Sequence, residues 1–560
     1  MNATLSETHS TAHPIIIAQR LLLSAALTLM ILHFAVYVVY AANLIPFPFD
    51  YDQGEGFELQ NVMLFASGDS PYKDNQQYPF FATNYPPFFH IMLIPLAKLF
   101  GAQYWYGRLV VFLGTLITAA AIGYAVRRET KHTPMAILSG LAFLASNYVY
   151  HIGPLFRQHM MMVMFETLAV VVLASLGSGR GRGQIVASLA LLLIAGYTKQ
   201  LAIATVAAVF IWLALRGVKR AVLYAIPFGL IAGGIFFLLN VLTNGEWWKA
   251  VITSNVNPYI LGQYVGLARQ FWGLHGALLI MAGLFFLYEL YFDRLSLYSV
   301  WFAAGALNSV LSGKWGAGDS YFATWIASIC LMAGIFTARF LQRDWRISPA
   351  LSVQVARLLV RMRLGWTIGR TAQSLTAFFG VIACVLWVLY GLAVMKLPLD
   401  MPIFSQVAQV FNLTSNTKFP NFYDSAGWTL GYATIGQIPT AQDIANGWRI
   451  VEAVKADPRP SLSEEAAFSF YANKPIVSNP PQLLNFYQGD LYDSTNLINM
   501  VEDHAFGTVV LRRDPGVTEI VGFYPPPVME AIKRAYQIDQ AIVMNGFEYT
   551  ILVPNPTWKR

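Results

Sequence analysis

Cysteines and charged residues are both scarce in this sequence. Only 2 of its 560 residues are cysteine, and 12% are charged. Cys330 and Cys384 stand apart without CxxC spacing, so they indicate neither a metal site nor a disulfide, and we expect them to pack in the core. A chain that is 56% hydrophobic with so few charges has more apolar surface than a soluble core needs. The composition therefore indicates a membrane protein.

Apolar runs of about membrane-spanning length recur along the first two thirds of the chain. A helix needs roughly 20 apolar residues to cross about 30 Å of hydrocarbon. The eleven candidate runs are 15–42, 103–126, 134–150, 160–176, 184–197, 200–215, 222–242, 273–291, 297–312, 321–338 and 374–395. The first is too long and too poor in a small-residue cleavage site for a removable signal peptide. The predicted fold class is an α-helical polytopic membrane protein with about eleven transmembrane helices.

The loops between these runs differ in charge, and the difference predicts an orientation. Short cytoplasmic loops retain Lys and Arg. If the N-terminus is cytoplasmic, the basic loops all fall on that side; they are 127–132, 179–183, 216–220, 292–294 and 339–370. Residues 43–85 hold six acids against Lys73 alone, so we expect this loop outside. The basic residues behind the net charge of +7 are spread over such loops. This distribution indicates that they set the orientation in the membrane and does not indicate a nucleic-acid partner.

A second domain is predicted after the last run. We divide the chain into a transmembrane domain, 1–396, with a first external loop at 43–102, and an extracytoplasmic α/β domain, 397–560. In the second domain we expect a helix at 447–456 and strands at 474–480, 506–514 and 548–554. Glu464 and Glu465 are adjacent and would diverge on a helix, with Ser463 as its cap, so this domain offers no catalytic set.

The stretch YDQGEGFELQ (51–60) concentrates acids directly after the first apolar run. In a helix, Asp52 and Glu55 are neighbours, as are Glu55 and Glu58, and such negative charge favours a cation or a proton-transfer role. Gly54 and Gly56 allow the backbone or a ligand to approach closely. The alternative is that these acids are solvated charges at the membrane surface.

The sequence that follows carries a family resemblance. Residues 86–100 are apolar, too short to span, and led by Pro86 and Pro87, so we expect a helix lying on the membrane surface. This loop resembles the first external loop of bacterial GT-C fold glycosyltransferases, a group that includes dolichyl-phosphate-mannose mannosyltransferases and aminoarabinose transferases. The residues that carry the resemblance are the acidic motif, Leu64, Ser67, Gly68, Pro71, Tyr72 and NYPP (84–87). YTKQ (197–200) and GKWGAGDSYF (313–322) also resemble motifs of this superfamily.

The resemblance implies a reaction and gives the acids a role. Such enzymes move a single sugar from a polyprenyl-phosphate donor to a hydroxyl of a glycan, lipid or protein acceptor, usually with inversion. Asp52 would be the general base, and Glu55 its partner, its alternative, or with Asp52 a ligand of a divalent ion such as Mg, Mn or Ca. Many relatives read Asp-Glu-Gly where this chain has Asp52, Gln53 and Gly54, so either Gln53 replaces a non-essential Glu or Glu55 acts in its place.

Basic residues at the same predicted membrane surface are candidates for the donor phosphate. Lys199 is flanked by apolar helix, where a charge is costly and tends to be functional, although it could also anchor a helix by snorkelling. Arg157 and His159 fall on the same side. Lys314 and Asp319 lie in a Gly-rich turn that lacks GxGxxG, so cradling by backbone amides is only weakly indicated. Tyr85 completes the predicted substrate-binding residues.

Three function classes follow from these patterns. The first is a multi-pass glycosyltransferase of the cell membrane, in a bacterial inner membrane, with the N-terminus cytoplasmic. A secondary transporter would also have many helices but needs ionisable or broken-helix sites near the bilayer midplane. A receptor or scaffold would use the helices only as an anchor for residues 397–560.

Overall fold

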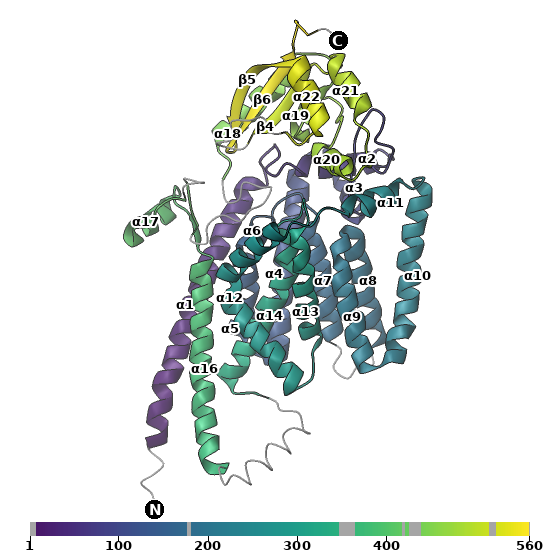
Figure 1. The fold of residues 1–560 in the computed structure, drawn as a ribbon. Helices are drawn as coiled ribbons and strands as arrows, with labels where there is room; N and C mark the ends of the chain where they lie inside the picture. The colour runs from purple at the N-terminus through teal and green to yellow at the C-terminus, as the bar shows by residue number, and fades with distance from the viewer. Residues whose placement is uncertain are drawn as a thin grey trace, which may run out of the picture.

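The computed structural model describes residues 7–175, 181–345, 365–416, 421–424, 438–513 and 522–558. A tall bundle of helices carries a smaller body of helices and strands at one end, and the N-terminus lies at the other end (Figure 1).

Each of the eleven apolar runs falls on a helix. These helices are α1 (Glu7–Leu44), α4 (Trp105–Thr130), α5 (Thr133–Ala145), α7 (His159–Ala174), α8 (Arg182–Thr198), α9 (Ile203–Arg216), α10 (Val218–Leu242), α12 (Leu261–Tyr291), α13 (Leu297–Ser309), α14 (Ala323–Gln342) and α16 (Gly365–Ala393). Six segments of the described chain, in α1, α4, α10, α12, α14 and α16, are long and apolar enough to cross a membrane. The other five helices are shorter, from 13 to 17 residues. The polytopic helical fold is therefore confirmed.

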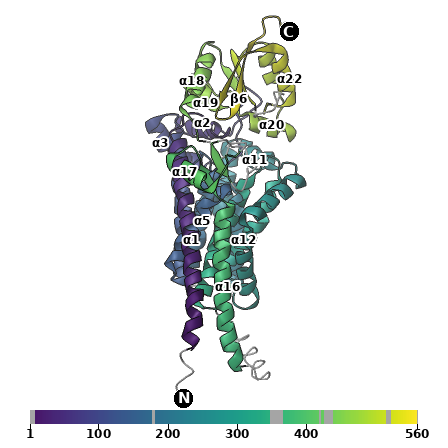
Figure 2. The ribbon, with the colours of Figure 1, turned by 90° about the vertical axis from the view of Figure 1, so that its left-hand side faces the viewer.

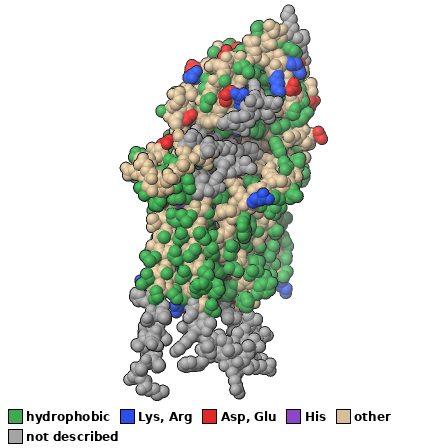
Figure 3. Space-filling model, turned by 60° about the vertical axis from the view of Figure 1, so that its left-hand side comes forward, with side chains coloured by type: hydrophobic (Ala, Val, Ile, Leu, Met, Phe, Trp, Pro, Cys, Tyr) green, Lys and Arg blue, Asp and Glu red, His purple; other side chains and the backbone are tan. Residues whose placement is uncertain are grey.

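Burial differs sharply from one long helix to another. The apolar window of α14 is 89% buried, which places α14 in the middle of the bundle, whereas that of α10 is 0% buried. Apolar side chains also cover the bundle surface in a band, with charged side chains above and below it (Figure 3). A band of this kind suits a lipid solvent.

The first and last long helices run side by side along the bundle (Figure 2). Gln19 of α1 donates to the carbonyl of Ala377 at 2.9 Å, and His33 Nε2 lies 2.9 Å from the carbonyl of Gly391. These bonds bring α1 and α16 together although more than 300 residues separate them.

The described basic residues after α9 and near the end of α14 lie at the end opposite the C-terminal body (Figure 1). Arg216 after α9 donates to the carbonyl of Leu295 at 3.5 Å, and Arg339 near the end of α14 lies 3.9 Å from Asp293. Because Lys and Arg favour the cytoplasmic side, this end is the predicted cytoplasmic face.

Short elements lie between the bundle and the C-terminal body. They are α2 (Glu55–Ala66), α3 (Phe88–Phe100), α6 (Asn147–Tyr150), α11 (Glu246–Val251) and the 3-10 turns η1 (Gln200–Ala202), η2 (Thr253–Asn255), η3 (Val310–Gly313) and η4 (Asp319–Phe322). The helix predicted at 86–100 is α3, which follows Pro87 and ends at Gly101, where the backbone turns at φ 71°. Leu99 and Phe100 on α3 are exposed, as expected for a helix on a membrane surface.

The C-terminal body contains a four-stranded sheet. Its strands are β3 (Ser461–Ser463), β4 (Thr508–Arg513), β5 (Tyr536–Met544) and β6 (Phe547–Pro554), in the order β3-β4-β6-β5. β3 pairs parallel with β4, and the other pairs are antiparallel. The helices are α18 (Ala441–Lys455), α19 (Ala466–Tyr471), α20 (Pro480–Gln488), α21 (Thr495–Glu502) and α22 (Pro526–Ala535). Before this body, β1 (Lys396–Pro398) pairs with β2 (Phe422–Asp424), with α17 (Pro402–Phe411) between them.

Two local predictions in this body are wrong. Residues 474–480 form a connection with one isolated bridge, from Ser478 to Phe80, because Pro475 and Pro480 remove backbone donors and Pro480 begins α20. Ser463 ends β3 instead of capping a helix; its hydroxyl accepts from the backbone N–H of Glu465 at 3.2 Å. The predicted helix at 447–456 and the strands at 506–514 and 548–554 correspond to α18, β4 and β6.

Candidate active site

A cavity of about 300 Å³ lies where the bundle meets the C-terminal body. Its walls come from α2, from residues 83–85, from the turns after α8 and α13, and from α20. Five of the predicted site residues line this cavity: Asp52, Tyr85, Arg157, Lys199 and Lys314. His159 and Asp319 line an adjoining cavity of about 60 Å³, which also touches Asp52, Tyr85, Arg157 and Lys199. Glu55 lines neither cavity.

Asp52 presents one held oxygen and one free oxygen. Arg157 Nε donates to Asp52 Oδ2 at 2.8 Å. Asp52 Oδ1 is buried and has no hydrogen-bond partner within the described chain. Burial raises the pKa of Asp52, although the charge of Arg157 opposes this change. A carboxylate with a raised pKa and a free oxygen suits a general base.

Arg157 links the two acids that face the cavity. Its Nη1 lies 3.5 Å from Glu58 Oε1, and His90 Nε2 of α3 lies 2.6 Å from Glu58 Oε2. Gly54 leaves room for the guanidinium, since a Cβ built there would lie 1.8 Å from Arg157 Nη1. The glycine is required by this close approach and not by its backbone angles, which are ordinary for a helix.

Lys199 lies in the break between α8 and η1, where its backbone is extended. Its Nζ is 2.9 Å from His159 Nδ1 and lies over the rings of Tyr85 and Tyr321, at 4.9 and 5.6 Å from their centroids. Burial lowers the pKa of Lys199 to about 7, and the positive charge of Arg157 acts in the same direction. This buried ammonium has aromatic and imidazole neighbours but no ion pair with a carboxylate among the described residues, so an anion entering the cavity would stabilise its charge.

The Gly-rich turn contributes a second lysine and a separate acid. Lys314 Nζ donates to the carbonyl of Asn255 at 2.5 Å, and burial lowers its pKa. Asp319 has a different partner: its Oδ2 lies 3.1 Å from His151 Nε2. The structure therefore places Lys314 in the main cavity and Asp319 in a pair with His151.

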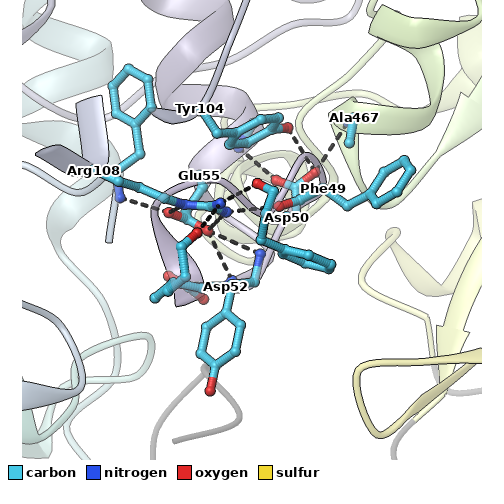
Figure 4. A network of polar contacts seen from close by, with 12 residues as sticks. Phe49, Asp50, Asp52, Glu55, Tyr104, Arg108 and Ala467 are labelled. Carbon is cyan, nitrogen blue, oxygen red and sulfur yellow. Dashed lines mark hydrogen bonds and ion pairs between the residues drawn. The ribbon is translucent and has the colours of Figure 1, made fainter. Parts of the chain in front are cut away.

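Glu55 forms an ion pair with Arg108 of α4 (Figure 4). Arg108 Nε donates to Glu55 Oε1 at 2.9 Å and Arg108 Nη2 to Glu55 Oε2 at 2.7 Å, and both side chains are fully buried. Glu55 Oε1 also accepts from the N–H of Phe156, and Oε2 from those of Tyr51 and Asp52. Burial alone would raise the pKa of Glu55, but Arg108 and these donors hold it below its ordinary value.

These contacts revise the prediction for Glu55. With both oxygens occupied by protein donors and neither facing a cavity, Glu55 does not fit a metal site shared with Asp52. The described residues also contain no group of three or more His, Cys, Asp or Glu arranged to hold a metal ion. Glu55 instead fixes the backbone at Asp52 and beside Arg157, so we infer a positioning role in place of the base or ligand role.

Asp50 joins this network to the C-terminal body (Figure 4). Asp50 Oδ2 accepts from Tyr104 Oη at 2.9 Å and from the N–H of Ala467 at 3.0 Å, while Oδ1 accepts from the N–H of Gly56 at 2.6 Å. Burial, together with the charge of Glu55, raises the pKa of Asp50 to about 7. The acidic loop is therefore held between α4 and α19.

Several lining residues were missed from the sequence. Eight of them are carboxamides: Asn61, Asn84, Gln200, Asn255, Asn257, Asn479, Gln482 and Asn485. Three of these belong to the C-terminal body, for which the sequence predicted no site. Scattered Asn and Gln carry no spacing signal, although the acid Glu58 was already visible in the acidic stretch.

Comparison with solved structures finds proteins of similar fold. ArnT from Cupriavidus metallidurans in its apo state aligns over 93% of this chain and 97% of its own, with 16% identity and a TM-score of 0.54. The same protein bound to undecaprenyl phosphate gives 15% identity and a TM-score of 0.53 over the same shares of the two chains. AglB from Archaeoglobus fulgidus, an archaeal oligosaccharyltransferase in complex with an inhibitory peptide and a dolichol-phosphate, covers 94% of this chain and 74% of its own, with 13% identity and a TM-score of 0.42.

No protein-family model and no curated protein matches the chain. The likeness to ArnT confirms the GT-C fold predicted from the first loop.

Proposed function

We propose that this chain is a membrane glycosyltransferase that moves a single sugar from a polyprenyl-phosphate donor to an extracytoplasmic acceptor hydroxyl, with inversion. The observation that carries the proposal is one cavity lined by Lys199, Lys314 and Asp52, whose Oδ1 has no hydrogen-bond partner among the described residues. A base and phosphate-binding cations are the groups that this displacement needs.

The apolar side of the cavity supports a lipid-linked donor. Leu201, Ile203 and Leu311 line it, and Ile203 is 73% exposed at the start of α9. A polyprenyl chain could lie along this apolar surface while its phosphate reaches the lysines. ArnT, which shares the fold, has been solved bound to undecaprenyl phosphate, and this supports the same class of donor here.

The reaction can be assigned to residues of this chain. The oxygen of the acceptor hydroxyl attacks the anomeric carbon from the face opposite the phosphate, and Asp52 Oδ1 accepts the proton of that hydroxyl. The bond from that carbon to the phosphate oxygen breaks, and its electron pair leaves with the polyprenyl phosphate. Lys199 and Lys314 stabilise the negative charge that develops on this leaving group, while Arg157 holds Asp52 Oδ2.

The C-terminal body favours an enzyme over an anchored scaffold. Asn479, Gln482, Asn485 and Phe523 belong to the cavity wall, so this body forms part of the proposed site. We therefore expect removal of residues 397–560 to abolish transfer.

The proposal is tested by Asp52→Asn, with Asp69→Asn as the matched control. Asp69 lies in the same loop but is exposed and paired with Lys73. We expect Asp52→Asn to lower transfer from undecaprenyl-phosphate-linked sugars by about 10²-fold or more while binding of undecaprenyl phosphate is kept. Full activity of Asp52→Asn in purified protein reconstituted with membrane acceptors would remove Asp52 as the base.

A further inference from the structure

Carboxamide side chains are frequent in the lining of the cavity, and we call them together the carboxamide wall. Of the 26 residues that line it, nine are Asn or Gln, against five with a charged side chain. The carboxamides come from segments far apart in sequence: residue 53, α2, residue 84, η1, the region 255–257, residue 479 and α20. Composition alone would not bring so many together, so the wall requires an explanation.

Most of these amides are oriented by the backbone. Asn479 donates its nitrogen to the carbonyl of Ala82 at 2.9 Å, and Asn485 to that of Ser254 at 2.6 Å. Asn257 donates to the carbonyl of Trp315 at 2.9 Å. Gln200 and Asn255 bond in the same way to backbone carbonyls, including that of Asn84. A carbonyl oxygen can only accept a hydrogen bond, so each of these side chains directs its NH₂ group at the backbone. The amide oxygens therefore remain as acceptors.

Two amides have buried atoms without a partner. Asn61 donates its nitrogen to Thr83 Oγ1 at 3.1 Å, but its Oδ1 has no hydrogen-bond partner in the described part of the chain. Nε2 of Gln482 is likewise unpartnered there. The two residues are only 2% and 6% exposed, and both line the cavity. A buried polar group without a partner is destabilising, so one free acceptor and one free donor indicate a polar ligand.

The charges of the lining indicate that this ligand is neutral. Its two carboxylates, Asp52 and Glu58, both lie against Arg157, and Glu58 also pairs with His90. Together with Lys199 and Lys314, Arg157 leaves the lining without a net negative charge that would attract an amino group. Lys199 and Lys314 are the cations assigned to the phosphate. What remains beside them is a neutral surface of acceptors and donors, which suits hydroxyl groups because each hydroxyl both donates and accepts.

We propose that six residues of the carboxamide wall, Asn61, Asn255, Asn257, Asn479, Gln482 and Asn485, form a subsite for the hydroxyl groups of an uncharged sugar. The proposal rests on the proposed function. The sugar belongs either to the lipid donor or to a carbohydrate acceptor, and the chemistry of the wall is the same for both.

Binding to the purified full-length protein separates these cases. The donor arm compares undecaprenyl phosphate alone with its glucose, mannose, galactose, 4-amino-4-deoxyarabinose and glucuronate esters. The acceptor arm measures binding of the methyl glycosides of the same sugars to protein saturated with undecaprenyl phosphate. Each arm is repeated with Gln482→Leu, with the near-isosteric Gln482→Glu, and with Gln488→Leu as control. Gln488 is exposed on the same helix.

We expect at least one uncharged sugar to bind about tenfold or more tightly than the reference without sugar, and the charged sugars to show no such gain. Gln482→Leu should reduce that gain about tenfold without changing the affinity for undecaprenyl phosphate, and Gln488→Leu should change neither. A gain in the donor arm assigns the subsite to the donor sugar, and a gain only in the acceptor arm assigns it to the acceptor.

The proposal is overturned if no uncharged sugar gains affinity in either arm, if a charged sugar alone gains it, or if both Gln482 variants keep the full gain. Failure of undecaprenyl phosphate itself to bind would instead count against the proposed function.

Discussion

Arg157 Nε lies 2.8 Å from one oxygen of Asp52, while the other Asp52 oxygen is buried without a hydrogen-bond partner among the described residues. The two side chains come from different connections of the bundle, after α1 and before α7. The contact fixes the carboxylate without occupying the oxygen that would take a proton. Asp52 is thereby oriented in the way that the proposed mechanism requires.

Gly54→Ala should disturb this pair without removing either partner. A Cβ at this position would lie 1.8 Å from Arg157 Nη1, so the guanidinium has to move away from Asp52. Because misplacement of a catalytic group by about 1 Å can cost 10²-fold in rate, we expect a loss of that order in transfer.

The control for this variant is Gly196→Ala in α8, where a Cβ would meet nothing within 4 Å. It should leave transfer unchanged. Equal activity of the two variants, measured as initial rates on folded protein, would contradict the role given to the Asp52–Arg157 contact.

Lys199→Ala should weaken donor binding. A charge-assisted hydrogen bond to phosphate is worth about 1.5–3 kcal/mol, which corresponds to roughly 10- to 150-fold in affinity for undecaprenyl phosphate. Lys98→Ala is the matched control, since Lys98 is an exposed lysine in the last turn of α3. Isothermal titration of both variants distinguishes a phosphate-binding role of Lys199 from a role as membrane anchor. Unchanged affinity of Lys199→Ala would make Lys199 a membrane anchor.

The same lysine predicts how donor binding depends on pH. Its pKa in the free protein is lowered to about 7, first by burial and then by Arg157. A bound phosphate favours the charged ammonium and raises this pKa, so binding takes up a proton above about pH 7. Affinity should therefore fall by up to tenfold per pH unit as the pH rises above about 7. In Lys199→Ala this slope should be lost; a slope that persists would assign the titration to another group.

Glu55→Gln should act on stability before it acts on chemistry. It leaves the fully buried Arg108 without its carboxylate, and breaking a buried pair in this way costs about 3–5 kcal/mol. We expect a lower unfolding temperature in detergent and no change in the response of transfer to divalent ions or chelators. A new requirement for divalent ions in Glu55→Gln at unchanged stability would restore Glu55 as a metal ligand.

The sequence predicted the fold well because that prediction depends on strong local signals. Eleven apolar runs became eleven helices, and Pro86 and Pro87 marked the start of α3. The strand predicted at 474–480 failed because the apolar residues there are flanked by prolines, whose missing N–H groups prevent a ladder.

The site was predicted only in part, since it depends on contacts between distant residues. Asp52, Arg157, Lys199 and Lys314 stood out because charges are rare in so apolar a chain. The partner of Glu55 could not be read from spacing, because Arg108 lies 53 residues away and inside a helix predicted to span the membrane. The amides of α20 were missed for the same reason: Asn and Gln are unremarkable until the fold brings them to one wall.

The central claim is that a polyprenyl phosphate binds beside Asp52, and its position can be measured directly. A cryo-electron microscopy map of the full chain with undecaprenyl phosphate should place the phosphate within hydrogen-bonding distance of Lys199 or Lys314, with the lipid chain leaving past Leu201 and Ile203. A phosphate bound at the opposite end, beside Arg216 or Arg339, would contradict both the site and the predicted orientation of the protein.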